Sequence, residues 1–400
     1  MCWIPASAGM TLEARDRGEQ DNMRSLMAHC ERELPWLLET IEALVRLESP
    51  TGDAAAINRC GVELERRLVA LGGRVRRLPH LAAGDHLRAE FGSGPRQVLI
   101  LGHLDTVWPV GTLSERPIRH DDGRMFGPGV FDMKAGLGLA MLAVKALAAS
   151  PDGVPGRIVM LTTSDEETGS ATSRTAIEEE ARQSEAVLVL EPSLPGGALK
   201  TSRKGCGEFL LRVDGVAAHA GIEPERGASA INELVRQIAA VEAMHDPGQG
   251  TTVNVGVIRG GSRPNVVAAE AEAVIDVRVA TSAAAARITE ALGSLLRRDP
   301  RTRLTLSGGI DRPPLERTPG VVALFHHARA VAADLGRTLG EGGTGGGSDG
   351  NLTAALGVPT LDGLGAIGGG AHAADEHVIV GDLPWRAALV AGLLRRILAV

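Results

Sequence analysis

The sequence is poor in the features of membrane, nucleic-acid-binding and secreted proteins. No apolar run approaches the roughly 20 residues that cross a bilayer, and the first thirty residues lack the basic and apolar segments of a signal peptide. Aromatic residues make up 2% of the chain. The formal net charge is −7, and the charged residues are spread along the sequence without a block of Lys or Arg. We therefore expect a cytoplasmic protein that binds small molecules. We do not expect it to bind nucleic acid or membranes.

Cysteine is also scarce. The chain has four cysteines, which form no CxxC pair and keep no spacing typical of metal ligands. We expect them to be reduced, structural thiols. A metal ion in this protein must therefore be held by nitrogen and oxygen. The four are Cys2, Cys30, Cys60 and Cys206.

Apolar runs and helical patterns alternate along much of the chain. At 400 residues and 44% hydrophobic content, the chain is long enough for two domains with real cores. Short apolar runs separated by amphipathic helices indicate an α/β fold, here a mixed, mostly parallel sheet with helices on both faces. The runs lie at 97–102, 157–163, 186–190 and 358–361, and the clearest helical patterns at 33–47, 55–73 and 383–400.

The middle of the chain has a different pattern. Residues 204–312 show the order β-α-β-β-α-β, which is typical of a ferredoxin-like α+β unit. We expect this unit to be inserted into a host domain made of residues 25–203 and 313–400. Residues 1–24 show no periodicity, and we expect an extension outside the fold.

Four polar clusters follow apolar runs, where strands of the sheet should end. They are "HLDT" (103–106), "GPGVFDMKAG" (127–136), "TSDEETGS" (163–170) and "LEPS" (190–193). Open α/β sheets bind ligands outside the carboxyl ends of their strands, so the clusters should share one crevice. So many carboxylates in one crevice require cations. The clusters contain His103, Asp105, Asp132, Asp165, Glu166, Glu167 and Glu191.

Imidazole and carboxylate ligands without thiolate favour Zn²⁺, Mn²⁺ or Co²⁺ over Ca²⁺ or Mg²⁺. A second histidine is expected late in the chain, where "GGGAHAADEHV" offers His372 and His377. His372 lies between two alanines and close to the glycine run, so its neighbours are small. We therefore expect His372 to be the ligand. The glycine-rich tract 340–350 ends in Ser348 and Asp349 before a helical pattern, as a binding loop that opens a helix would.

Taken in this order, the motifs resemble a family of di-zinc metallopeptidases and deacylases. The family includes bacterial glutamate carboxypeptidase, acetylornithine deacetylase, succinyl-diaminopimelate desuccinylase and the aminoacylases. The resemblance covers residues 30–400. It implies a zinc-peptidase catalytic domain with a separate inserted domain, residues 204–312, that acts as a lid and through which two subunits form a homodimer.

The resemblance also implies the roles of the polar clusters. Two Zn²⁺ per subunit, replaceable by Mn²⁺ or Co²⁺, are bridged by Asp132, which a cis peptide bond joins to Met133. Asp105 steadies the imidazole of His103, and Glu166 is the general base that activates a water between the metals. The implied metal ligands are His103, Asp132, Glu167, Glu191 and His372.

Further residues implied by the resemblance lie in or near the inserted unit. His219 reaches across the dimer to stabilise the oxyanion, and Asn265 and Arg278 bind the substrate around its carboxylate. The loop with Gly347 and Ser348 is expected to bind a carboxylate as well.

The expected activity is metal-dependent hydrolysis of the amide bond to a C-terminal amino acid with a free carboxylate, as in a glutamate carboxypeptidase. Glu191, at a position that is aspartate in some branches, favours this reading. An N-acyl amino acid deacylase or a dipeptidase with the same site is the alternative.

A non-catalytic zinc-binding scaffold is disfavoured because no expected ligand or base is missing. A phosphate-binding enzyme built on "GGTGGGSDGN" is disfavoured because no Walker lysine follows.

Overall fold

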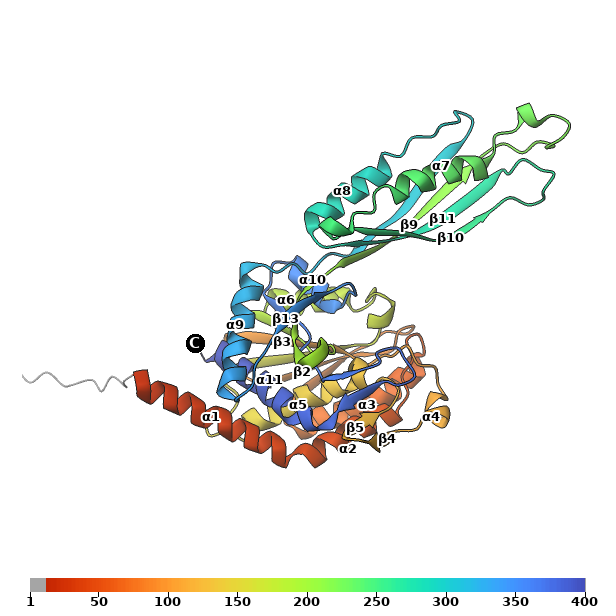
Figure 1. Cartoon of the computed structure of the whole chain (residues 1–400). Coiled ribbons are helices and arrows are strands. Elements are labelled where there is room, and N and C mark those ends of the chain that lie inside the picture. The colour runs from red at the N-terminus through yellow and green to blue at the C-terminus, as the bar shows by residue number, and fades with distance from the viewer. Residues whose placement is uncertain (1–11, 400) are drawn as a thin grey trace, which may run out of the picture. The chain divides into compact units, whose positions relative to one another are not determined.

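The computed structural model describes residues 12–399, and side chains from residue 20 onward (Figure 1). The chain divides into two compact units. The first runs to Thr201 and includes Thr318–Gly342 and the segment from Val358 onward; the second comprises Ser202–Arg317 and Gly343–Gly357. Within residues 12–399 no helix combines the length and the apolar character needed to cross a bilayer.

A six-stranded sheet forms the centre of the first unit. Its strand order is β1-β2-β6-β3-β7-β14, in which β6, β3, β7 and β14 are parallel neighbours and β1 and β2 form an antiparallel edge. The predicted mixed, mostly parallel sheet is confirmed. The strands are β1 (Arg74–Leu78), β2 (His86–Gly92), β3 (Gln97–His103), β6 (Arg157–Thr163), β7 (Ala186–Val189) and β14 (Thr360–Leu361).

Helices cover both faces of this sheet. Successive side chains of a strand point to opposite faces, so Leu87 and Ala89 of β2 join the main apolar cluster while Arg88 points the other way. Arg88 pairs with Glu180 of α6 (Arg174–Arg182), which places α6 on that other face. The helices of the cluster's face are α1 (Leu12–Arg32), α2 (Leu34–Arg46), α3 (Ala54–Ala70), α5 (Ala135–Ala148), α9 (Pro319–Asp334) and α11 (Leu383–Leu398).

The expectation that residues 1–24 lie outside the fold is wrong for the part that the structure describes. Residues from Leu12 onward belong to α1, and residues 1–11 lie outside the described range. Met23 is 6% exposed and packs with Leu26 and Cys30 against the rest of the core. The spacing from Met23 to Leu26 and Cys30 is that of one helix face. This apolar face crosses the expected boundary at residue 24.

A small antiparallel sheet of order β15-β16-β5-β4 lies in the same unit. β16 pairs with β5, which precedes Asp132 in the chain, and His372 lies between β15 and β16. The pairing therefore brings two segments with predicted ligands together. The strands are β4 (Arg119–Asp121), β5 (Arg124–Phe126), β15 (Gly368–Gly369) and β16 (His377–Ile379); the short helix α4 (Thr112–Glu115) precedes β4, and β8 (Leu199–Arg203) pairs with β13 (Glu341–Thr344).

The second unit has the element order predicted for residues 204–312. Its antiparallel sheet has the order β10-β11-β9-β12, and the apolar side chains that alternate along β9 pack with α7 and α8. The sheet is ferredoxin-like. The elements are β9 (Gly205–Asp214), α7 (Ala230–Glu242), β10 (Thr252–Gly260), β11 (Glu270–Val279), α8 (Ser282–Gly293) and β12 (Arg303–Arg312).

Residues 343–357, which the sequence placed in the host domain, group with the second unit. They contain α10 (Asp349–Ala355). Arg312 at the end of β12 pairs with Asp349 at 3.0 Å, and the amide of Asn351 donates to the carbonyl of Pro313 at 2.7 Å. These buried polar contacts attach α10 to the strand that precedes it in the unit.

Candidate metal centre

The predicted ligands leave neighbouring strands of the central sheet. His103 is the last residue of β3, the 3₁₀ turn Glu166–Thr168 follows β6, and Glu191 lies two residues after β7. Because β6, β3 and β7 are parallel neighbours, their carboxyl ends lie side by side. The strand order thus collects residues that are far apart in the sequence.

Asp132 comes from the loop that leads into α5. A close contact positions this helix, since a Cβ added to Gly136 would lie 2.2 Å from the carbonyl oxygen of Leu190. Only glycine allows the first turn of α5 to approach the end of β7 so closely. This contact sets Asp132 beside Glu191. The predicted cis peptide bond between Asp132 and Met133 is confirmed.

One cluster contains His103, Asp132 and Glu191. The Nε2 atom of His103 lies 3.4 Å from Oδ1 of Asp132 and 3.5 Å from Oε1 of Glu191. His103 is 1% exposed, and among the described residues its Nε2 and Asp132 Oδ1 are buried atoms without a hydrogen-bond partner. Ligands bound to one cation at 2.0 to 2.1 Å in tetrahedral geometry lie about 3.3 Å apart. The spacing fits ligands of a shared cation better than hydrogen bonds.

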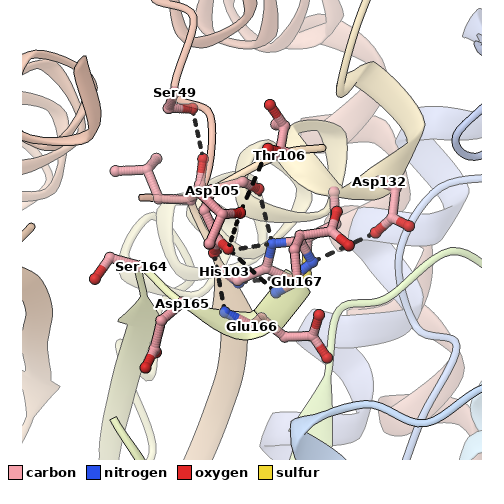
Figure 2. Close-up of polar contacts among 12 residues, drawn as sticks. Ser49, His103, Asp105, Thr106, Asp132, Ser164, Asp165, Glu166 and Glu167 are labelled. Atoms are coloured by element: carbon pink, nitrogen blue, oxygen red, sulfur yellow. Dashed lines mark hydrogen bonds and ion pairs between the residues drawn. The ribbon is translucent and has the colours of Figure 1, made fainter. Parts of the chain in front are cut away.

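A second cluster contains Asp132, Glu167 and His372. The Nε2 atom of His372 lies 3.3 Å from Oδ2 of Asp132 and 3.3 Å from Oε2 of Glu167. Asp132 therefore directs one oxygen to each cluster. Figure 2 shows His103 with Asp105 on one side and Asp132 on the other. His372 has a left-handed backbone (φ 61°), a conformation that non-glycine residues rarely adopt and that occurs often at functional sites.

The electrostatics of both clusters favour a bound cation. The nearby carboxylates of Asp132 and Glu167 raise the pKa of His372 to about 10. Burial lowers the pKa of His103, but Asp105, Asp132 and Glu191 outweigh it and raise that pKa well above its ordinary value. The carboxylates thus hold both rings in the charged form. Divalent cations would supply this positive charge, and two imidazoles with carboxylates suit Zn²⁺, Mn²⁺ or Co²⁺.

Asp105 supports this centre differently from the expected contact. The Nδ1 atom of His103 lies 2.9 Å from the main-chain oxygen of Asp105 and 3.5 Å from its carboxylate. The carboxylate instead accepts hydrogen bonds from the Thr51 hydroxyl at 2.7 Å and from the N–H groups of Glu167 at 3.1 Å and Glu166 at 3.3 Å. The main-chain carbonyl is thus the nearest partner of the imidazole. The carboxylate holds the turn that carries both glutamates.

The two acids before Glu167 point in opposite directions. Figure 2 shows the Asp165 carboxylate on one side of the turn and the Glu166 carboxylate on the side of Asp132. Asp165 accepts hydrogen bonds from the N–H and hydroxyl of Thr172 at 2.7 and 2.8 Å and from the hydroxyl of Ser173 at 2.6 Å. Asp165 therefore closes the loop, and Glu166 is the acid directed toward the metal centre.

Comparison with known proteins identifies the family. The model of peptidase family M20/M25/M40 matches residues 99–396. The chain belongs to this family. It is therefore a metal-dependent hydrolase that acts on peptide or amide bonds, in a family whose members act on small peptides and acyl amino acids.

Several M20 relatives match nearly the whole chain. Carboxypeptidase G2 of Pseudomonas sp. (strain RS-16) is 32% identical over 372 residues, which cover 90% of this chain and 89% of that protein. Succinyl-diaminopimelate desuccinylase of Xylella fastidiosa (strain 9a5c) is 28% identical over 358 residues, covering 85% and 93%. The structure of aminopeptidase PepT from Bacillus cereus ATCC 10987 has a TM-score of 0.74 at 23% identity and covers 91% and 98%. This structure shares the fold.

The remaining residues predicted for the M20 site lie in the second unit. His219 is exposed, and its Nδ1 accepts a hydrogen bond from the N–H of Gly221 at 3.1 Å. The loop of Asn265 lies beside it, since the Asn265 carbonyl accepts from the N–H of Ala220 at 3.0 Å. The structure thus brings His219 and Asn265 together within this unit.

Arg278 and the glycine-rich loop have partners inside the second unit. Arg278 makes a two-point ion pair with Asp276, with Nη2 2.8 Å and Nε 3.0 Å from the carboxylate. The Ser348 hydroxyl caps α10 by accepting from the N–H of Gly350 at 3.1 Å. The carbonyl of Gly347 accepts from Arg203 at 2.9 Å. Each of these predicted substrate-binding groups therefore forms a hydrogen bond or ion pair within the second unit.

Two outcomes concern the stretch "HAADEHV" of this M20 chain. His377, the other candidate for the late ligand, lies against the tilted ring of Phe126 and forms a hydrogen bond with the carbonyl of Asp375. Of the two histidines, His372 is the one that joins a cluster. Sequence reasoning missed Glu376, which is 3% exposed and contacts the loop of Asp132. Its position four residues after the predicted ligand His372 does not by itself reveal these main-chain contacts.

Proposed function

We propose that this M20 hydrolase cleaves the amide bond between an acyl or peptidyl group and a C-terminal amino acid with a free carboxylate. The observation that supports the proposal is Asp132, whose two oxygens serve two clusters that each contain an imidazole. We further propose that the two clusters hold two Zn²⁺ ions. The similarity to Carboxypeptidase G2 favours release of a C-terminal amino acid.

In this proposal His103 and Glu191 would hold one cation, Glu167 and His372 would hold the other, and Asp132 would offer one oxygen to each. Bound cations would lower the pKa of a water and polarise the scissile carbonyl. The Glu166 carboxylate accepts a proton from the water while the oxygen of that water attacks the acyl carbon. The bond from carbon to nitrogen then breaks, and Glu166 returns the proton to the leaving amine.

Deacylation of an N-acyl amino acid is the second candidate. It requires the same centre and is favoured by the match to succinyl-diaminopimelate desuccinylase over 85% of this chain. The two candidates differ in the part of the substrate that is recognised. A carboxypeptidase recognises the amino acid that leaves, whereas a deacylase of this kind recognises the acyl group.

A substrate panel distinguishes these candidates. Purified protein would be incubated with N-acyl and dipeptidyl forms of several amino acids, together with matched compounds whose α-carboxylate is amidated, and the released amino acid would be quantified. The proposal predicts release from many acyl groups and strict dependence on the free carboxylate. Turnover of amidated compounds at equal rates would refute it, and strict dependence on one acyl group would favour the deacylase.

We propose that Arg278 binds the substrate carboxylate by a two-point contact, the geometry it already makes with Asp276. Arg278→Ala should lower kcat/KM by roughly 2 to 4 kcal/mol for substrates with a free carboxylate, and much less for their amides. Arg259→Ala is the matched control, because Arg259 also pairs with a strand acid, Glu272, at 3.1 Å. Equal losses for acids and amides would assign Arg278 to folding alone.

We also propose a homodimer formed through residues 204–312, with His219 stabilising the oxyanion in its partner's site. The exposed His219 supports this, as does the edge strand β10, whose Val257 and Ile258 are 40% and 59% exposed. His219→Ala should lower kcat, and mixing it with an inactive Glu166→Gln chain should restore about one working site per heterodimer. Mixtures that stay inactive after proven subunit exchange would rule out a role across subunits.

A further inference from the structure

In the described part of the chain, the buried carboxylate of Glu376 accepts four hydrogen bonds from neutral donors. Its Oε2 accepts from the N–H of Gly129 at 2.8 Å and from the indole N–H of Trp108 at 2.7 Å. Its Oε1 accepts from the N–H groups of Phe131 at 2.9 Å and Asp132 at 3.0 Å. The side chain is 3% exposed. Burying a carboxylate is costly unless hydrogen bonds offset the loss of water, so these donors and the acid hold one another in place.

The three main-chain donors belong to the loop that carries Asp132. Gly129 has a left-handed backbone (φ 71°), which turns the N–H groups that follow it toward one point. Such a concave arrangement of N–H groups binds anions. The Glu376 carboxylate fills it from within the chain. A contact made to the N–H of Asp132 itself fixes the main chain from which the shared carboxylate projects.

The same residue is connected to the loop of His372. Glu376 lies four residues after His372, and its N–H donates to the carbonyl of Ala373 at 3.1 Å. The N–H of Ala373 in turn donates to the carbonyl of Gly370 at 2.8 Å. These turns tie the main chain on both sides of His372 to Glu376. One side chain thus connects the two loops that carry Asp132 and His372.

We propose that Glu376 is a positioning residue that sets the cation site formed by Asp132, Glu167 and His372. This role rests on the proposed two-cation centre. Glu376 accepts from the main chain of Asp132, which both clusters share, and closes the turn that directly follows His372, which belongs to this cluster alone. His103 and Glu191 are carried by the ends of β3 and β7 and not by the loop of Glu376. Its loss should weaken the second site more than the site of His103.

The deciding variant is Glu376→Gln, which keeps size and shape but replaces one accepting oxygen by an NH₂ group that faces N–H donors. Metal-free protein would be titrated with Co²⁺, and both binding steps followed by visible absorption and calorimetry. Affinity at the second site should fall about 10- to 100-fold, the usual loss when a group that orients a ligand is removed. Affinity at the first site should change by less than about threefold, and kcat should fall with little change in KM.

Glu233→Gln is the matched control. Glu233 is a buried acid of the second unit that accepts from the N–H groups of Arg298 at 2.9 Å and Asp299 at 3.1 Å, with no contact to a predicted ligand. Its substitution should leave Co²⁺ binding unchanged. If Glu376→Gln does not fold, Trp108→Phe decides, because it removes one donor to Glu376 and keeps an aromatic ring. It should weaken the second site selectively and to a smaller extent.

The outcomes separate this role from the proposed function. A wild-type chain that binds fewer than two Co²⁺ would refute the two-cation centre and this role with it. A wild-type chain that binds two, with Glu376→Gln equal to it or weakened equally at both sites, would overturn the role of Glu376 alone. Selective loss at the second site, with the unfolding temperature of the metal-free variant unchanged, would establish it.

Discussion

Complete removal of metal is expected to abolish hydrolysis, and Zn²⁺, Mn²⁺ or Co²⁺ should restore it while Ca²⁺ and Mg²⁺ should not. The side chains of His103 and His372 face the carboxylates of both clusters at distances that fit ligands of shared cations. Cations that activate water and polarise a carbonyl contribute several kcal/mol to the transition state, so the rate should fall at least about 10³-fold. Activity after chelation, dialysis and readdition of each ion is the measurement.

Two controls make the result decisive. Elemental analysis would verify that the treated protein holds no metal, and circular dichroism would verify that it is still folded. Full activity of folded, verified metal-free protein would contradict the proposed function. Restoration by Ca²⁺ alone would contradict the preference inferred from the two imidazole ligands.

Replacing Glu166 by glutamine should lower kcat by about 10²- to 10⁴-fold, the usual contribution of a general base. The variant should still bind both cations, because neither cluster contains Glu166. The substituted amide keeps the size of the side chain, and the N–H of Glu166 that donates to Asp105 is unchanged. Steady-state kinetics together with metal content would test both halves of this prediction.

Glu179→Gln on α6 is the matched control for this variant, because Glu179 is exposed and its substitution makes the same chemical change. It should have the rate of the wild type. If Glu166→Gln retained a near wild-type rate with a full complement of metal, another group would have to be the base. Loss of metal in the variant would instead make Glu166 a ligand.

The strands that carry the site could be predicted because each is buried on both faces. Such strands read as continuous apolar runs, as in "VLIL" of β3 and "IVML" of β6. β1 was missed because its sequence, "RVRRL", is polar and mostly exposed at the sheet edge. The helix α1 was missed because its apolar face, from Met23 to Cys30, continues across the point where the fold was expected to begin.

The candidate ligands could be predicted because each lies in a short motif next to a strand or helix that periodicity reveals. The main-chain contacts that hold them in place could not. Asp105 and Glu376 act by accepting main-chain N–H bonds from Glu167 and from the loop of Asp132. A backbone donor has no signature in the sequence, and its partner can be distant, as Glu376 is from Gly129. Only the folded chain shows which acids serve this purpose.

The most direct measurement is anomalous diffraction at the zinc absorption edge from crystals of the protein loaded with Zn²⁺. The account predicts two peaks of anomalous density on opposite sides of the Asp132 carboxylate, about 3.5 to 4 Å apart. One peak should lie within coordination distance of His103 and Glu191, and the other within coordination distance of Glu167 and His372. A single peak, or two peaks that do not share Asp132, would contradict the two-cation centre.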